Sequence, residues 1–388
     1  MPASPFAHDE VTGGSRAADP ASLTRLFGTD EGLLPLWIAE PYLPLAPGVV
    51  DALQGRANAT WYGYEVRPGR ISGALWEWMG THHGWDGADL TTSISPSVGT
   101  SIGVLLERLT APGDGVILQP PVFTDFKPLV AAARRRLVRN PLRLIGDGYQ
   151  MDLEGLAAAA AQPGTSALIL CNPHNPVGRV WAPEELAAVA EICARYGVFV
   201  VADEIHADLA LAPHAFTPFA KVAAGTGVRW AATHGPIKTF GLAGVCDTFL
   251  ITDDEEAADL FRARSSQLHL TRNNVFALAA TEAAYTTGGP WLADLLDLVA
   301  TNFELLRKQL PDGIDLVEPE GTYLAWLDLR KLGMDVPELV AWLTAAGLAL
   351  SPGHWFGREG AGFARMTVAA PSSQIEDAIR RLSSAVDG

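Results

Sequence analysis

Several features that would mark whole classes of protein are missing from this sequence. It has only three cysteines in 388 residues, at positions 171, 193 and 246. An odd number at long spacings gives neither a disulfide framework nor a zinc cluster, so we expect a reducing, cytoplasmic setting and no metal site. No apolar run reaches the length of a membrane span. Residues 1–22 lack the apolar stretch of a signal peptide, so we expect no contact with membranes.

Positive charge is also scarce. Lysine and arginine number 28 against 44 aspartates and glutamates, which gives a formal net charge of −16. Such a chain would repel phosphate backbones, so we expect no nucleic-acid partner. Apolar residues make up 48% of the chain and charged residues 19%, which is enough for large cores and excludes global disorder.

The pattern of the chain predicts a layered α/β fold. Short apolar strands are expected at 91–95, 115–118, 167–170, 198–202 and 228–232, with helices between them, for example at 101–109 and 183–196. Continuous apolar strands that alternate with helices predict a mostly parallel sheet covered on both faces. The chain beyond residue 286 reads as a smaller α+β domain, with helices at 290–310, 337–347 and 374–386 and strands at 323–327 and 363–368.

We therefore divide the chain into three segments. Residues 1–48 form an N-terminal arm and part of a small domain, with 1–30 expected to be flexible. Residues 49–286 form the large domain, and residues 287–388 complete the small C-terminal one.

One lysine stands in a turn that should strip it of water. Thr233–Gly244 is small and rich in glycine, and Lys238 lies at its centre. An ammonium in an apolar turn loses hydration, which lowers its pKa. A lysine tuned in this way is a candidate Schiff-base nucleophile. The alternative is an ordinary loop lysine with its ammonium group in solvent. The other residues around Lys238 must decide between these two interpretations.

Other chemically useful residues follow the expected strands at their carboxyl ends, where ligands gather in parallel α/β sheets. Together with Lys238, the set is Ser97, Val98, Gly99 and Thr100 in one turn, then Phe123, Asn175 and Asp203. Five such positions with complementary chemistry at one sheet edge indicate a site for pyridoxal 5′-phosphate.

Each position fits one part of that cofactor. Lys238 would form the imine, and Asp203 would keep the pyridine nitrogen protonated, which makes the ring an electron sink. The helix start at 97–100 offers backbone N–H groups to the phosphate. Phe123 would cover the ring, and Asn175 would donate to its phenolate oxygen.

The same residues have ordinary structural interpretations. Asp203 and the 97–100 turn could be helix caps, Phe123 could be a core residue, and Asn175 could be a turn former. Taken together, these alternatives would require five coincidences.

Two further residues complete the predicted site. Arg365 would hold the carboxylate of an amino-acid substrate, because a guanidinium binds carboxylates through two donors. A surface ion pair is its alternative. His206 is assigned to the cofactor site, and a hydrogen-bonded core residue is the alternative to direct catalysis.

Several motifs together carry a family resemblance. They are Cys171–Trp181, Ala202–Leu209, Ile237–Phe240 and Gly321–Asp328. These stretches resemble fold-type I pyridoxal-phosphate enzymes, and most of all the cystathionine β-lyase or C–S lyase branch of the class I/II aminotransferases. The motifs Gln119–Phe123, His83–Trp85 and Ser351–Gly353 agree with that branch. The resemblance runs from about Leu34 to the C-terminus and implies a three-layer large domain with a mostly parallel sheet.

The resemblance implies the cofactor roles given above and adds three residues. Tyr64 matches a tyrosine that reaches the phosphate in the neighbouring subunit, which implies a homodimer with shared sites. Ala39 lies where backbone lines the substrate pocket, and Tyr323 belongs to the last matching motif and is assigned to the substrate.

The chain departs from the family pattern around the substrate. Ile237 replaces a small hydroxylated residue, Gly241 replaces a frequent asparagine, and Glu40-Pro41-Tyr42 replaces an acidic motif. The sequence after Arg365 also differs. We therefore expect β-elimination from a specialised S-substituted cysteine rather than from cystathionine. An aminotransferase, or a decarboxylating or oxidatively deaminating enzyme acting on a modified amino acid, is the alternative.

Overall fold

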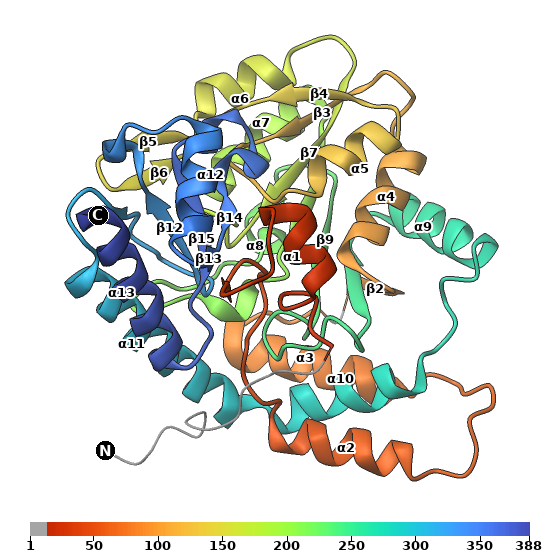
Figure 1. The fold of residues 1–388 in the computed structure, drawn as a ribbon. Coiled ribbons are helices and arrows are strands. Elements are labelled where there is room, and N and C mark those ends of the chain that lie inside the picture. Colours follow the sequence, from red (N-terminus) through yellow and green to blue (C-terminus); the bar gives the residue numbers. More distant parts are fainter. Residues whose placement is uncertain (1–13, 88) are drawn as a thin grey trace.

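The computed structural model describes residues 14–87 and 89–388, and its centre is a seven-stranded sheet (Figure 1). In spatial order the strands are β2 (Thr91–Ser95), β10 (Thr248–Thr252), β9 (Trp230–His234), β8 (Phe199–Asp203), β7 (Thr165–Cys171), β3 (Gly115–Leu118) and β4 (Arg136–Arg139). Strand β10 runs antiparallel to both of its neighbours, and the five strands from β9 to β4 are parallel. The predicted mostly parallel sheet is confirmed.

Helices cover both faces of this sheet because successive strand side chains point to opposite sides. On β3 and β7, Val116 and Ile169 enter one core, whereas Ile117 and Leu168 enter the other. The first core is closed by α4 (Val98–Leu109), α5 (Phe126–Ala132) and α9 (Glu255–Gln267). The second lies under α2 (Pro47–Ala57), α3 (Gly69–His83), α6 (Leu153–Ala160), α7 (Pro183–Tyr196), α8 (Phe219–Ala223) and α10 (Val275–Thr287). The three-layer arrangement matches the expected one.

Helix α7 shows how local signals fix the boundaries of an element. Pro183 occupies the first helical turn, and Glu185 accepts a hydrogen bond from the backbone of Ala182 at 3.0 Å. Gly197 ends the helix with φ of +66°, a conformation that glycine adopts without strain. The predicted bounds 183–196 are therefore confirmed.

A second sheet is built mainly from the C-terminal part of the chain. It contains β11 (Asp315–Leu316), β12 (Leu324–Asp328), β15 (Phe363–Thr367) and β14 (Ser351–Pro352), all antiparallel. It is accompanied by α11 (Gly289–Gln309), α12 (Val336–Ala345) and α13 (Ser372–Asp387). β1 (Leu34–Pro35) pairs in parallel with β13 (Leu348–Ala349), which ties the N-terminal segment to this part of the molecule. The exact domain boundaries stay a prediction.

The expectation that residues 1–30 form a flexible arm is wrong for part of that range. Pro20–Phe27 is a helix, α1, with the Asp19 carboxylate accepting from the Ser22 N–H at 2.8 Å. Leu23 and Phe27 are buried against Trp37. The helix is short, so its apolar periodicity is too brief to stand out in the sequence. Residues 1–13 lie outside the described residues.

The remaining elements are short. β5 (Arg143–Ile145) and β6 (Gly148–Gln150) form a hairpin, and single 3₁₀ turns occupy Ala207–Leu209, Arg330–Leu332, Gly353–Phe356 and Arg358–Gly360. Among residues 14–87 and 89–388, no helix combines the length and apolar character needed to cross a bilayer.

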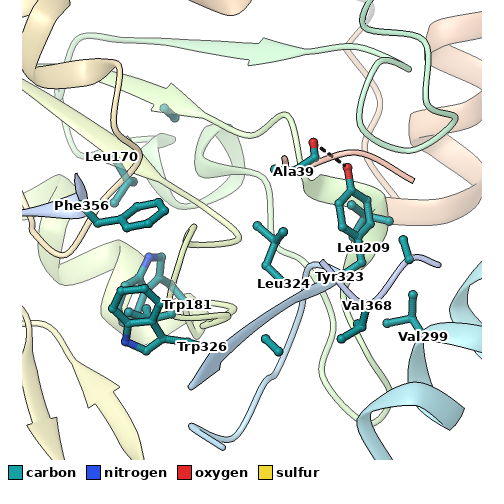
Figure 2. Packing of buried hydrophobic residues seen from close by; sticks show 14 of the residues in the cluster. Ala39, Leu170, Trp181, Leu209, Val299, Tyr323, Leu324, Trp326, Phe356 and Val368 are labelled. Atoms are coloured by element: carbon teal, nitrogen blue, oxygen red, sulfur yellow. Dashed lines mark hydrogen bonds between the residues drawn. The ribbon is translucent and has the colours of Figure 1, made fainter. Parts of the chain in front are cut away.

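A buried amide on α11 holds the chain that follows β15. The Asn302 Nδ2 group donates to the carbonyls of Val368 at 2.8 Å and Ala370 at 2.9 Å, and its Oδ1 accepts from Ser372. Val368 lies beside Val299 of α11 in the apolar packing of this region (Figure 2). Because the segment stays buried after β15, its carbonyls need donors from the protein, and these bonds fix the end of that strand.

We predict that Asn302→Ala lowers the free energy of unfolding by about 2 to 3 kcal/mol, because two buried carbonyls lose their donor. Urea denaturation measures the change. Thr301→Ala is the matched control, since the Thr301 side chain is exposed and bonds only within its own helix. Equal, small effects of the two substitutions would contradict the role given to Asn302.

Candidate active site

A cavity of about 270 Å³ opens where β7 and β8 end and where the chain turns after β9. Eight predicted residues line it: Ser97, Val98, Gly99, Phe123, Asn175, Asp203, His206 and Lys238. A larger surface groove of about 520 Å³ lies beside α11 and β11 and contains none of the predicted site residues. Most of the predicted site residues therefore lie around the smaller cavity.

Lys238 is held in a compact turn between β9 and the following loop. The Phe240 N–H donates to the Pro236 carbonyl at 2.9 Å, and Gly241 has φ of +68°. The Lys238 Nζ donates to the carbonyl of Ala39 at 2.8 Å. Burial, with the nearby Arg365 charge, lowers the pKa of Lys238 to about 8. The predicted loss of hydration is present.

The Ala39 carbonyl is shared by two donors. The Tyr323 hydroxyl also donates to it, at 3.3 Å, as Figure 2 shows. Burial and the nearby Glu40 charge raise the pKa of Tyr323, so its hydroxyl keeps its proton. The structure thus brings Lys238, Ala39 and Tyr323 together, as the sequence predicts.

Asp203 is the last residue of β8 and faces the same cavity. Its Oδ1 accepts from the Ile205 N–H at 3.3 Å and from the Thr233 hydroxyl at 3.2 Å. Burial raises the pKa of Asp203 to about 6, against the lowering effect of these hydrogen bonds and of Lys238. It caps no α-helix, and its carboxylate is available to a cationic ligand group.

His206 is buried, and its Nδ1 has no hydrogen-bond partner among the described residues. Burial, followed by the charges of Lys238 and Arg365, holds the pKa of His206 well below its usual range, so the imidazole is neutral. A core histidine would have its ring nitrogens satisfied within the protein. The orphan Nδ1 therefore favours contact with a ligand.

The start of α4 is both a helix cap and a wall of the cavity. The Ser97 Oγ accepts from the Thr100 N–H at 3.1 Å and lies 2.9 Å from the Thr100 hydroxyl. The N–H groups of Val98 and Gly99 lie in the first turn, where helices leave donors without internal partners. Thr100 does not line the cavity, and its N–H donates to the cap.

Arg365 lies on β15 and is buried, so the alternative of a surface ion pair is wrong. Its two terminal nitrogens donate to the Asn175 Oδ1 at 3.1 Å, to the Trp37 carbonyl at 2.7 Å and to the Ser351 Oγ at 3.3 Å. Its Nε has no partner among the described residues. Burial lowers the pKa of Arg365 to about 10, which leaves it charged at neutral pH.

Arg365 also lies 4.8 Å from the centre of the Phe356 ring, which favours its positive charge. Asn175 uses its Oδ1 toward Arg365, so its Nδ2 remains as a donor. These contacts hold the guanidinium at the boundary between the two sheets.

The sequence missed part of this constellation. Asp125, Ile205 and Cys171 also line the cavity, together with Ile102, Phe126, Leu129 and Ile237. Asp125 lies two residues after Phe123, and that spacing is the one signal that could have found it. The contact between Trp37 and Arg365 joins residues far apart in the sequence, and no local pattern indicates it.

Tyr64 lies away from the cavity of its own chain. Its side chain is 89% exposed, on the loop between α2 and α3. The predicted role of Tyr64 in a neighbouring subunit concerns a second copy of the chain and stays a prediction.

Comparisons with known proteins identify the family of the chain. The family model described as "Aminotransferase class I and II" matches residues 70–382. The cystathionine beta-lyase PatB of Bacillus subtilis is 35% identical over 93% of this chain and 94% of its own length.

Solved structures give the same picture. A pyridoxal-phosphate-bound structure from Clostridium difficile 630 superposes with a TM-score of 0.92 and 32% identity, covering 98% of each chain. Cystalysin from Treponema denticola, which contains pyridoxal 5′-phosphate, superposes with a TM-score of 0.89 and 26% identity, covering 98% of this chain and 99% of its own. The predicted fold class is confirmed, and the chain belongs to the class I and II aminotransferase family.

Proposed function

We propose that this protein is a pyridoxal-phosphate-dependent lyase that cleaves the C–S bond of an S-substituted cysteine by β-elimination. The observation that carries the proposal is that Lys238 and Asp203 face one cavity, which also receives the start of α4. The names of the similar proteins, a cystathionine beta-lyase and cystalysin, support the same reaction class.

The residues of the cavity fit the cofactor. Among the described residues, the Asp203 carboxylate accepts protein hydrogen bonds through Oδ1 alone, the His206 Nδ1 has no partner, and the start of α4 presents N–H groups at one wall. A volume of about 270 Å³ lies near the lower end of ordinary ligand sites. Lys238 would bond the aldehyde carbon, Asp203 would face the pyridine nitrogen, and Val98 and Gly99 would donate to the phosphate.

When bound, pyridoxal phosphate supplies a protonated ring that stabilises negative charge at the α-carbon of the substrate. The chain supplies proton transfer. At pH 7 about a tenth of Lys238 is the free amine, far more than for an ordinary lysine, because its pKa is about 8. The free amine removes the α-proton, and the Ala39 carbonyl holds the Nζ in reach.

Arg365 orients the amino acid. Its terminal nitrogens are fixed by neighbouring groups, and the unpartnered Nε remains for the substrate carboxylate. A carboxylate held there fixes the face of the substrate that meets Lys238. The thiolate then leaves from the β-carbon, and addition of water yields thiol, pyruvate and ammonia.

The substrate is a specialised S-conjugate in our proposal. Tyr42 and Tyr323 are buried near Arg365, and burial raises the pKa of both hydroxyls. Glu40 and Tyr42 belong to the segment that replaces the acidic motif of the family, and the Tyr323 hydroxyl lies at the Ala39 carbonyl beside this segment. Buried aromatic side chains beside one carboxylate suit a leaving group with apolar bulk.

Transamination is the second candidate, and the family description favours it directly. The first proton removal is shared. The two reactions differ in the next step. In transamination Lys238 would return the proton to the cofactor, whereas in β-elimination the leaving group would depart first. The products decide between them.

We further propose a cytoplasmic homodimer that shares its sites, with Tyr64 approaching the phosphate of the second copy. Three buried, unpaired cysteines support a reducing compartment. In this proposal residues 49–286 form the large domain, and residues 1–48 and 287–388 form the arm and small domain.

We predict that the protein releases thiol and pyruvate in equal amounts from S-ethylcysteine. Lys238→Ala should abolish both products and the absorbance of lysine-bound cofactor, because the base and the covalent anchor are lost together. Thiol and keto-acid assays measure the outcome. Keto acid without thiol, formed only when an amino acceptor is present, would assign the chain to transamination instead.

The pKa of Lys238 gives a pH prediction. The neutral amine is the nucleophile, so the rate at which apoprotein bonds pyridoxal phosphate should rise with pH and level off above about 8. Arg365→Gln should move this inflection to higher pH, because the Arg365 charge helps to lower the pKa. Stopped-flow absorbance follows the reaction. A rate that still climbs near the ordinary lysine pKa, roughly 10.4, would show that the amine is not desolvated.

Arg365→Lys should raise the KM for the amino acid by about 10- to 100-fold, with a smaller change in kcat, because lysine has no Nε donor for the substrate carboxylate and cannot keep the contacts that hold the guanidinium in place. Arg358→Lys is the control, since Arg358 is 81% exposed and pairs only with Glu359. Steady-state kinetics test both variants. Equal KM values for the two would remove Arg365 from the substrate site.

A further inference from the structure

An exposed apolar surface lies on a loop that does not line the cavity of its own chain. We call residues 61–66 the aromatic loop. Trp61, Tyr62, Tyr64 and Val66 are 60%, 49%, 89% and 90% exposed. So much apolar surface on consecutive residues marks a site of interaction with another molecule.

A second segment, residues 268–274, is bound to the aromatic loop. The Asn273 Nδ2 donates to the Glu65 carbonyl at 2.6 Å, and Phe276, just beyond the segment, stacks on Tyr62 with ring centres 5.8 Å apart. The Arg272 guanidinium lies 5.8 Å from the centre of the Tyr64 ring. Because Arg272 contacts Tyr64, we expect it to enter the same site of a second molecule as Tyr64 does.

Arg272 differs from the other arginines around this loop. Arg56 pairs with Glu65, and Arg67 pairs with Asp247. Arg272 is exposed and has no carboxylate partner among residues 14–87 and 89–388. Its charge is therefore free to bind an anion outside its own chain.

The cavity, in turn, is short of positive charge where the phosphate would lie. The charged side chains that line it are Asp125, Asp203 and Lys238, and the residue before the lysine is the apolar Ile237. The amine of Lys238 is committed to the aldehyde carbon. A helix start contributes about half an elementary charge, whereas a phosphate ester carries roughly −1.5 to −2. The phosphate end needs a cation that the described residues of one chain do not provide.

We propose that Arg272 of one copy enters the Lys238 cavity of a second copy beside Tyr64 and pairs with the cofactor phosphate. The inference rests on the proposed homodimer and cofactor, and it deepens them by naming the phosphate's counter-ion. The occupant of the aromatic loop is thus a second copy of this chain. An unpaired cation on an exposed apolar face would thus supply positive charge at the phosphate end of the cavity, because Lys238, the one cation that lines the cavity, is used at the aldehyde end.

The test is cofactor retention by the holoenzyme. Arg272→Gln should weaken retention of pyridoxal phosphate by about 10- to 100-fold, the range expected for a lost charge-assisted hydrogen bond. The loss of lysine-bound cofactor absorbance after dilution measures it. Arg195→Gln is the matched control, because Arg195 is an exposed arginine in the last turn of α7. It should retain the cofactor as the unchanged chain does, and equal retention by both variants would overturn the proposal.

Mixed dimers test whether Arg272 acts between copies. Chains carrying Arg272→Gln are co-expressed with chains carrying Lys238→Ala under two affinity tags. In the mixed dimer, the one intact Lys238 meets the intact Arg272 of the other copy, so tight retention should return. If Arg272 acts within its own chain, no recovery occurs and the proposal fails.

Two further measurements distinguish loss of a phosphate contact from loss of the dimer or of a substrate contact. Sedimentation of Arg272→Gln should show a dimer, and a monomer would reassign Arg272 to a contact that only joins the copies. The KM for S-carboxymethylcysteine and for S-ethylcysteine should change alike. A rise confined to the acidic substrate, with retention unchanged, would move Arg272 from the phosphate to the substrate side chain. If the unchanged chain neither binds cofactor nor releases thiol, the proposed function itself has failed.

Discussion

The site depends on two opposite charges that the fold withdraws from water within one cavity. Burial lowers the pKa of Lys238 to about 8 and raises the pKa of Asp203 to about 6. In an ordinary core, burying either charged group alone would destabilise the protein. Together they leave an amine that can react and an acid that can stabilise a cation, both near neutral pH. The parallel strands provide this, because β8 ends at Asp203 and the turn after β9 carries Lys238.

The second sheet enters the site through one residue. Arg365 on β15 reaches Asn175 of the large sheet region and Trp37 of the N-terminal segment. The position of the guanidinium therefore depends on three parts of the chain that are distant in sequence. Its burial without a carboxylate partner is tolerated because carbonyl, amide and hydroxyl oxygens surround it, and because a ring lies beneath it. A substrate carboxylate would supply the missing negative charge.

The sequence predicted most of what lies on regular elements. Buried parallel strands are apolar throughout, so β3, β7 and β8 stand out, and the polar residues at their ends fall into one cavity. Gly241 illustrates a departure that the backbone explains: its φ of +68° suits glycine or asparagine, so the replacement preserves the turn. Helix α1 and strand β10 were not predicted, because one is short and the other is a five-residue strand outside the expected alternation. Long-range contacts such as Trp37 with Arg365 have no local signature.

The backbone from Trp37 to Ala39 accepts hydrogen bonds from two buried cations. The carbonyls of Trp37 and Ala39 accept from Arg365 and Lys238 respectively. Between these two carbonyls the chain bends, and the Glu40 N–H donates to the Ile38 carbonyl at 3.0 Å. Two peptide units, with one unit between them, thus set the spacing between the guanidinium that would hold the amino acid and the amine that would remove its proton. Insertion or deletion of one residue here would turn one carbonyl away, so during evolution this segment can change its side chains far more freely than its length.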